Sequence, residues 1–453
     1  MPEFLPELKT FLDESNAKLV ESLLESLKIH ELDEILVKKF EATWNALPPA
    51  CNFAPRDLAV CATDGSFGAR RLINGMTFAV SRALAISNIK EEVKKLWGGF
   101  VTSSSLNAQG DISDYISYQT EHQEHKAILA FFENHAGDGT PLLALMDGSI
   151  YGRLRRFFVE LPINEDPGFM VKYHETFTTL LHKLLSNPNL HLIGVSKDSN
   201  TRFINKTFYA EIVKDVLDDV GPLFPADDLA VLTEILDLDN KTNYTTRSRF
   251  QALIQDATSA RNNMLDELFR YKEYKLPDFY FIDKYLRGTP GFSKPFVLIP
   301  RDEMRGAKRV HAGTVAQLFP RTLARIQDDR RDEASRAIVS IHANLTSIPP
   351  VVTSYATLGQ NDTPVRIDFL ANSDDLQAGF NDVPAMEQYV SWLRACYGGL
   401  DNYNIFLTQV DQRVKLTNQI LDNLYKQLFE QSIKKPLIYS RDQRRLKTYK
   451  RTG

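Results

Sequence analysis

Two apolar segments that each run into the tripeptide Asp-Gly-Ser constrain the fold of this 453-residue chain more than any other feature. The first, DLAVCATDGS, spans residues 57–66, and the second, LLALMDGS, spans residues 142–149. A short apolar run bounded by turn residues is typical of a buried β-strand. We therefore predict two buried strands that end in turns, with Asp64 and Asp147 at matching positions. If the strands lie side by side in register, the two carboxylates meet at one edge of the sheet.

Further strands and helices alternate along the chain, which predicts a mixed α/β sheet with helices on its faces. The other expected strands lie at 76–87, 191–197, 337–345, 349–358 and 363–371, with short ones near 279–282 and 296–299. The expected helices lie at 114–135, 168–185, 201–219, 384–397 and 411–430.

The length of the chain exceeds that of one small domain, so we expect two or three units. The expected segments are an N-terminal helical arm (1–50), the first part of the sheet core (51–220), a mostly helical insertion (221–335) and the completion of the core with C-terminal helices and a basic tail (336–453). The N-terminal arm fits a packed helical hairpin and a docking or dimerisation arm equally well.

The composition argues against several kinds of protein. A net charge of −4 gives no global support for nucleic-acid binding, so any DNA contact must come from a local basic surface. The tail at 441–451 is basic enough to bind phosphate, although a solvated terminus fits equally well. Three cysteines without C-x-x-C spacing cannot form a zinc ribbon, and their low number fits a reducing compartment. No long apolar segment and no signal peptide are evident, so we expect a cytoplasmic protein without a membrane anchor.

Asp64 and Asp147 are candidate metal ligands, because neighbouring carboxylates repel one another and a divalent cation relieves that repulsion. A single Asp-Gly pair is a common turn, and one Asp-Gly-Ser alone would be read as structural. Two of them at matching strand ends make a site and a pair of turns about equally well supported. Lys197, at the end of the strand at 191–197, is suited to holding a phosphate, although alone it would be read as a surface lysine.

These motifs, in this order, resemble the NurA nuclease family: an apolar strand into DGS, a strand LMDGSI, and a later strand GVSK. That family also has the pattern Y-P-x-x-L-x-x-A-H before a final helix. Here the corresponding stretch contains Tyr403 and Leu407, while Asn404 stands for the proline and Asp411 for the histidine. The strand PVRIDF around Arg366 also resembles the family. The likeness extends from about residue 57 to about residue 420, apart from the insertion.

The resemblance implies a dimeric nuclease with an RNase H-like core that uses Mn²⁺ or Mg²⁺. It also implies a partner, HerA, a hexameric ATPase that translocates DNA during the resection of DNA ends. In this interpretation Asp64 and Asp147 are the fixed metal ligands and Lys197 stabilises developing charge. Tyr403 belongs to the catalytic set, and Asp411 is a hard ligand in place of histidine, although a carboxylate cannot shuttle protons near neutral pH as histidine does.

The family further implies a glutamate ligand on the helix before the second DGS. Three glutamates stand there: Glu121, Glu124 and Glu133. We favour Glu124, because the apolar residues that follow it give the helix a packing face. His122 and His125 lie on the same helix, and without a third partner we expect surface histidines rather than zinc ligands.

Two further interpretations stay open. The first is a catalytically weak scaffold that clamps DNA within a HerA-like ATPase complex, and the aspartate at position 411 is the feature that supports it. The second is a different RNase H-like nuclease, such as an Argonaute-like or endonuclease V-like enzyme. The lack of a recognisable guide-binding domain and the GVSK strand argue against the second. A role in DNA repair and one in antiviral defence both fit.

Overall fold

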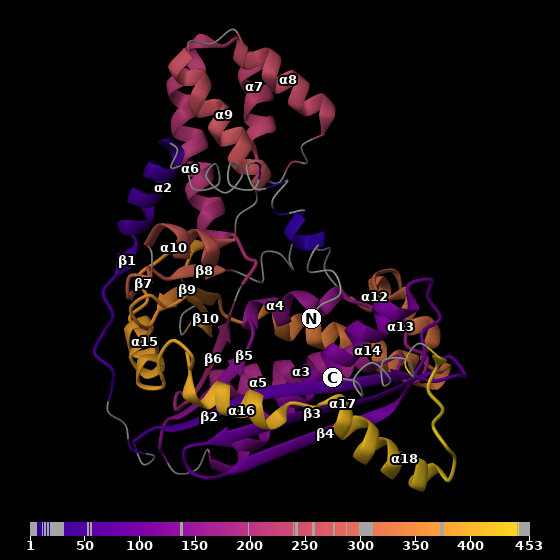
Figure 1. The fold of residues 1–453 in the computed structure, drawn as a ribbon. Helices are drawn as coiled ribbons and strands as arrows, with labels where there is room; N and C mark the ends of the chain where they lie inside the picture. Colours follow the sequence, from indigo (N-terminus) through magenta and orange to yellow (C-terminus); the bar gives the residue numbers. More distant parts are fainter. Residues whose placement is uncertain are drawn as a thin grey trace. The chain divides into compact units, whose positions relative to one another are not determined.

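The computed structural model describes residues 7–10, 12, 15, 18, 31–51, 54, 57–135, 139–197, 199–238, 240, 243–255, 259–274, 277–286, 288–298, 311–371, 376–441 and 443. The chain divides into two compact units. One consists of Met1–Trp44 and Asn200–Leu286, and the other of Asn45–Ser199 and Arg287–Gly453. Figure 1 shows both units, which we describe separately. Most of the expected helices between residues 5 and 30 lie outside the described residues.

The first unit is helical. Its helices are α2 (Glu31–Glu41), α6 (Phe203–Val220), η2 (Gly221–Leu223), α7 (Ala226–Leu236), α8 (Tyr244–Gln255), α9 (Ser259–Tyr274) and α10 (Asp278–Leu286). Phe40 of α2 packs between Phe281 and Phe208, with ring centres 4.5 and 4.8 Å away. The predicted strand at 279–282 is wrong, because those residues belong to α10. Phe281, Ile282 and Leu286 are its buried apolar side chains, and their spacing is that of a helix.

The second unit is built on a mixed sheet in which five strands, β2 to β6, have RNase H-like order, as expected. They are β2 (Ala59–Arg71), β3 (Thr77–Ser87), β4 (Glu92–Val101), β5 (Leu142–Asp147) and β6 (Leu190–Ser196). In space they follow the order β4-β3-β2-β5-β6. The hairpins β2–β3 and β3–β4 are antiparallel, whereas β5 runs parallel to β2, and β6 parallel to β5.

Strands from the C-terminal part of the chain extend the sheet beyond β6. They are β7 (Gly291–Ser293), β8 (Phe296–Leu298), β9 (Val351–Thr357), β10 (Val365–Leu370) and β11 (Gly379–Phe380). β10 lies antiparallel to β6, and β9 lies antiparallel to β10. Residues far apart in the sequence therefore meet beside β6, where Arg366 is paired with Ser196.

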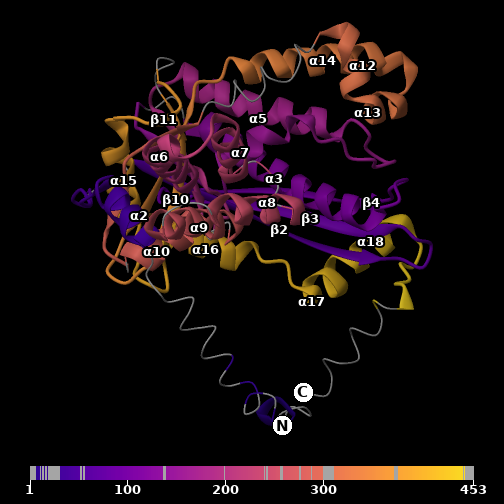
Figure 2. The same ribbon diagram turned by 90° about the horizontal axis from the view of Figure 1, so that it is seen from above.

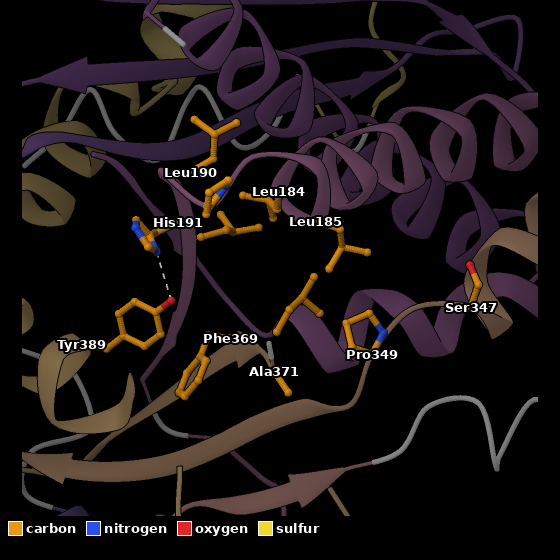
Figure 3. A pocket seen from close by; sticks show the side chains of 12 residues that line it. Leu184, Leu185, Leu190, His191, Ser347, Pro349, Phe369, Ala371 and Tyr389 are labelled. Carbon is orange, nitrogen blue, oxygen red and sulfur yellow. Dashed lines mark hydrogen bonds between the residues drawn. The ribbon is translucent and has the colours of Figure 1, made fainter. Parts of the chain in front are cut away.

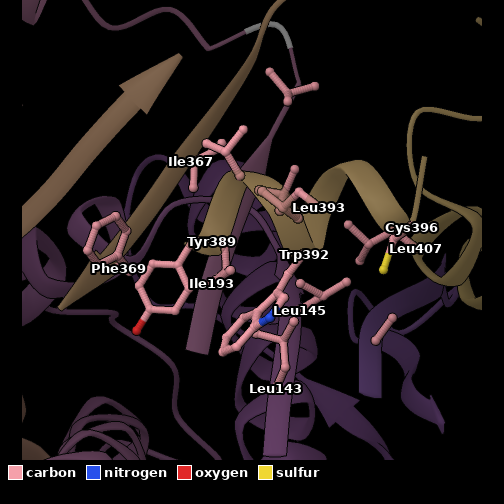
Figure 4. Close-up of a cluster of buried hydrophobic side chains, with 14 of the residues drawn as sticks. Leu143, Leu145, Ile193, Ile367, Phe369, Tyr389, Trp392, Leu393, Cys396 and Leu407 are labelled. Carbon is pink, nitrogen blue, oxygen red and sulfur yellow. The ribbon is translucent and has the colours of Figure 1, made fainter. Parts of the chain in front are cut away.

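Helices cover both faces of this sheet (Figures 1 and 2). α3 (Ala108–His135) and α5 (Phe169–Ser186) lie on one face, and α14 (Asp328–Thr346) packs on α5. α15 (Ala385–Ala395) and α16 (Ile405–Val414) lie on the other face. Figure 4 shows the core under α15, where Tyr389, Trp392 and Leu393 meet Leu143, Leu145 and Ile193 of the strands. Shorter helices complete the unit: α4 (Ile150–Leu154), η1 (Arg155–Phe158), α12 (Ala312–Leu318), α13 (Pro320–Arg325), α17 (Asn418–Ile420), η3 (Leu421–Tyr425) and α18 (Lys426–Ile433).

Three expectations about the second unit are corrected. The strand at 57–66 does not end at its DGS, because β2 continues to Arg71 and stays paired with β3 along its whole length. The residues 337–345, predicted as a strand, belong to α14, whose buried Ile338, Ile341 and Leu345 recur at helical spacing. The helix predicted at 411–430 is interrupted, because α16 ends at Val414.

Candidate metal centre

The structure places Asp64 and Asp147 next to each other on neighbouring parallel strands. In the β2–β5 register Ala62 is paired with Leu145, and Thr63 with Met146, so Asp64 and Asp147 come next in line. Ala62 and Leu145 belong to the core under α15 and α16. Since side chains along a strand alternate between faces, both aspartates point to that same face. Gly148, directly after Asp147, has a φ of 105°, and this left-handed conformation favours glycine.

Gly65 has a different role, because it lies within β2 and not in a turn. A Cβ atom at this position would lie 2.6 Å from Oε1 of Glu124. The missing side chain therefore lets α3 approach the strand closely beside Asp64.

The electrostatics of the two aspartates are those of a pair that repels. Burial raises the pKa of Asp64 to about 7, and the charge of Asp147 adds to the rise. The backbone N–H of Gly65 donates to Oδ1 of Asp64 over 2.7 Å and acts in the opposite direction. Burial also raises the pKa of Asp147, while Lys197 and Arg153 lower it. The two carboxylates together thus favour a proton or a cation between them.

Lys197 and Tyr403 meet beside these aspartates. The Nζ atom of Lys197 lies 4.2 Å from the ring centre of Tyr403, a cation–π contact that holds an exposed lysine at the end of β6. The hydroxyl of Tyr403 is buried, and no hydrogen-bond partner for it lies among the described residues. Burial and the charges of Asp147, Asp64 and Asp411 raise the pKa of Tyr403, so its phenol stays protonated. A buried donor without a partner is what a bound ligand would satisfy.

Asp411 lies on α16, which begins at Ile405 and is preceded by Asn404. The Asn404 side chain accepts hydrogen bonds from the backbone N–H groups of Phe406 and Leu407, each over 3.1 Å, and so caps the helix. Capping accounts for an asparagine where the family pattern has proline. Asp411 itself is exposed, and its charge acts on the pKa values of both Asp64 and Asp147.

The three candidate glutamates on α3 have different surroundings. Glu124 is buried, and its Oε2 accepts a hydrogen bond from Nη2 of Arg153 over 2.6 Å. Burial raises the pKa of Glu124 to about 8, although Arg153 acts in the opposite direction. Glu121 is paired with Arg156, and Glu133 is exposed near Lys183. Only Glu124 among the three abuts Gly65, and it does so from the α3 face, opposite to the Asp64 side chain.

The expectation that His122 and His125 are surface residues is wrong. Both are buried, because α3 lies between the sheet and α5 and has no wide solvent-facing side. The ring of His125 stacks on Phe177 at 4.5 Å between centres, and Nε2 of His122 hydrogen-bonds the Thr176 hydroxyl over 2.9 Å.

Sequence reasoning missed Asp368, which supports the turn after Asp147. Asp368 is fully buried on β10 and accepts hydrogen bonds from Nε and Nη2 of Arg366 over 2.8 and 2.9 Å. The Ser149 hydroxyl donates to Oδ2 of Asp368 over 2.6 Å. Ser149 in turn accepts from the backbone N–H of Gly152 over 2.9 Å and caps α4. The Arg-x-Asp pattern on β10 was the available signal for a buried ion pair. No sequence pattern indicated that Asp368 also contacts Ser149, 219 residues earlier.

Oxygen donors of this kind suit a hard divalent cation such as Mn²⁺ or Mg²⁺. Within the described part of the chain, no three His, Cys, Asp or Glu side chains lie close enough together to hold a metal ion as they stand. Asp64 and Asp147 thus lie together as two carboxylates, and any third donor from the described residues would have to move towards them.

A cavity of about 460 Å³ lies at another place in this unit. It is lined by Leu190, His191, Phe369 and Tyr389, among others, where β6 begins and β10 ends (Figure 3). A hydrogen bond of 3.1 Å joins Nδ1 of His191 to the Tyr389 hydroxyl. Since Asp147 is opposite Val195, near the end of β6, this cavity is not part of the aspartate site.

The structure says little about two expectations, a DNA-binding basic tail and the lack of a membrane anchor. Nearly all of the basic tail at 441–451 lies outside the described residues. Among the helices that are described, none combines the length and the apolar character needed to cross a bilayer.

A family model described as the NurA domain matches residues 58–416, which is more than half of the chain. The chain is also similar to the crystal structure of the NurA nuclease from Sulfolobus solfataricus, with 13% identity, a TM-score of 0.49, and 94% of this chain and 97% of that chain covered. A second structure, described as NurA, has 15% identity and a TM-score of 0.38 and covers 92% and 97%. No curated protein matches the chain. The family assignment therefore rests on the domain match.

Proposed function

The chain belongs to the NurA family, and from this premise we propose that it is a metal-dependent deoxyribonuclease that hydrolyses phosphodiester bonds. The proposed task is the resection or degradation of DNA, carried out by a homodimer together with a HerA-like hexameric ATPase. The observation that carries the metal dependence is the juxtaposition of Asp64 and Asp147 at adjacent positions of β2 and β5.

Asp64 and Asp147 would hold Mn²⁺ or Mg²⁺. Asp411 would complete the ligand set from the α16 face, or Glu124 from the α3 face past Gly65, in each case after a side-chain movement. Asp411 is exposed and free to change its rotamer, whereas Glu124 is buried and held by Arg153. When bound, such a cation supplies an activated water and neutralises charge at the scissile phosphate.

The other residues of the site act on the substrate directly. Lys197 is exposed and positively charged, so its ammonium group is available to a phosphate oxygen on which negative charge develops. The ring of Tyr403 limits where that ammonium group can be, because the two lie 4.2 Å apart. The unpartnered hydroxyl of Tyr403 stays protonated and is suited to donate a hydrogen bond to the same phosphate group.

The alternative function is a catalytically weak subunit that clamps DNA within the ATPase complex. Two observations favour it: position 411 is an aspartate, and among the residues that the structure describes no third donor is in place beside the two aspartates. An aspartate is a competent ligand for a hard cation but does not exchange protons near neutral pH as a histidine does. The alternative therefore predicts DNA binding with little or no cleavage.

Cleavage assays separate these two functions. Linear single- and double-stranded DNA would be incubated with Mn²⁺, Mg²⁺ or EDTA and with wild type, Asp64→Asn or Asp147→Asn. Asp332→Asn, at an exposed position of α14, is the matched control. The nuclease predicts cleavage that EDTA and both site substitutions abolish and that the control retains. Wild-type protein that stays inert in every metal, also with a HerA-like ATPase added, would instead support the DNA clamp. Light scattering tests the homodimer in the same preparations.

A further inference from the structure

A buried arginine, Arg153, lies next to the aspartate site and contacts the backbone of Asp147. It belongs to α4, the first helix after the second DGS, and only 4% of its surface is exposed. A buried charge is costly unless partners satisfy it, so the contacts of this guanidinium group indicate what the charge is for.

Arg153 joins the two elements that carry the proposed ligands. Its Nη2 donates to Oε2 of Glu124 over 2.6 Å and to the carbonyl oxygen of Asp147 over 3.0 Å. Its Nη1 donates to Nε2 of His125 over 2.7 Å. The planar guanidinium group thus links α3 to the end of β5 through three acceptors, which a single ammonium group cannot reproduce.

The contact leaves one oxygen of Glu124 unused by Arg153. That atom, Oε1, faces β2 at Gly65, the residue after Asp64. The two oxygens of Glu124 therefore have different surroundings. Oε2 accepts the hydrogen bond from Arg153, and Oε1 faces the strand that carries Asp64.

We propose that Arg153 is a positioning residue that fixes Glu124 and the backbone of Asp147 relative to each other, and so sets the affinity of the site for its cation. This inference rests on the proposed function, because it assumes that Asp64 and Asp147 bind a divalent cation. Arg153 is not a ligand itself and acts only through the groups that it holds.

The chain provides a matched comparison in a second Arg–Glu pair. Glu121, one helical turn before Glu124 on α3, pairs with Arg156 of η1. The guanidinium group of Arg156 also lies over the ring of Tyr118, 4.6 Å from its centre. This second Arg–Glu pair also connects the segment after the DGS to α3. It has no contact with Asp147 among those that the structure describes, and Glu121 does not abut Gly65.

The test is direct titration of Mn²⁺ into metal-free protein, followed calorimetrically and by the EPR signal of free Mn²⁺. Arg153→Lys keeps the charge but loses the planar guanidinium group and its several N–H donors. We expect Mn²⁺ to bind this variant roughly 10- to 100-fold more weakly, as for other residues that orient metal ligands. Arg156→Lys should bind Mn²⁺ as wild type does. Amide exchange of residues 147–152 without metal should be faster in Arg153→Lys, because the contact with the Asp147 carbonyl is weakened.

A double-substitution cycle distinguishes positioning from general support of the fold. In a Glu124→Gln background, Arg153→Lys should cause a smaller loss of Mn²⁺ affinity than in wild type, since part of its effect passes through Glu124. Losses that are equal in both backgrounds, or an unchanged affinity in Arg153→Lys, would overturn the inference while leaving the nuclease proposal intact. Wild-type protein that binds no Mn²⁺ would instead overturn the metal dependence itself. The Lys and Gln substitutions keep approximate volume, and melting curves verify that each variant is folded.

Discussion

Replacing Asp64 by Asn should stabilise the metal-free protein at neutral pH but not near pH 4. Asn keeps the shape of the side chain and can still accept the hydrogen bond from Gly65, but it removes one of two adjacent buried charges. The pKa of Asp64 is raised from 3.8 to about 7 by burial and by Asp147. The folded protein therefore holds a proton that the unfolded chain releases between these two pH values.

The sign and size of the effect follow from that difference. Because the folded state binds more protons than the unfolded state between pH 4 and 7, the stability of wild type falls as the pH rises through this window. One pKa unit is worth about 1.4 kcal/mol, so the full difference amounts to about 4 kcal/mol above pH 7. Solvent reaches part of the Asp64 carboxyl and screens it, so we expect about half, roughly 2 kcal/mol. For a unit of this size that is a rise in melting temperature of about 5 °C.

The assay is thermal unfolding in EDTA at intervals from pH 4 to pH 8, with Asp332→Asn as the exposed control. The difference between Asp64→Asn and wild type should be close to zero at pH 4, grow through pH 5 and 6, and level off above pH 7. The control should show no such growth. A constant difference, or a destabilised Asp64→Asn at pH 8, would refute the view that Asp64 and Asp147 form a repelling pair.

Three further substitutions test single contacts. Gly65→Ala should lower stability by about 1–3 kcal/mol, because the added methyl group meets the side chains of Thr120 and Glu124, and thermal unfolding measures this. Tyr403→Phe removes a buried hydroxyl without a described partner, so the metal-free protein should gain about 1 kcal/mol while cleavage slows; unchanged cleavage would exclude a role for the hydroxyl. Asp368→Asn removes the charge of the buried carboxylate that pairs with Arg366 and should cost about 3–5 kcal/mol by chemical unfolding, so a loss under 1 kcal/mol would contradict the ion pair.

The strands that bear the two aspartates were predictable from the sequence because each is a short apolar run. The edge strand β4, which pairs with β3, was not predicted, since its charged Lys94 and Lys95 hide the alternation of a strand with one exposed side. The helix α14 was misread because Ile338 and Val339 favour strands locally, while the spacing of its buried residues is helical. Local composition and periodicity disagreed there, and packing on α5 decided between them.

The order of motifs along the chain indicated which residues to examine, but not their contacts. The roles of Arg153 and Asp368 depend on hydrogen bonds between residues 29 and 219 positions apart, which no local pattern encodes. Likewise, the burial of His125 follows from the position of α5 over α3. Long-range pairing of buried polar groups is therefore the part of the site that only the folded structure reveals.

The helical unit formed largely by residues 200–286 separates two groups of the proposed site residues along the chain, so they are synthesised at different times. Asp64, Asp147 and Lys197 precede residues 200–286, whereas Tyr403 and Asp411 follow them. A ribosome that adds about 5–20 residues per second therefore produces the two aspartates and the lysine well before the tyrosine and α16. During that interval the nascent chain has the acidic pair but not the side chains that close over it. The proposed site can thus be complete only after residue 411 of the 453 has been added.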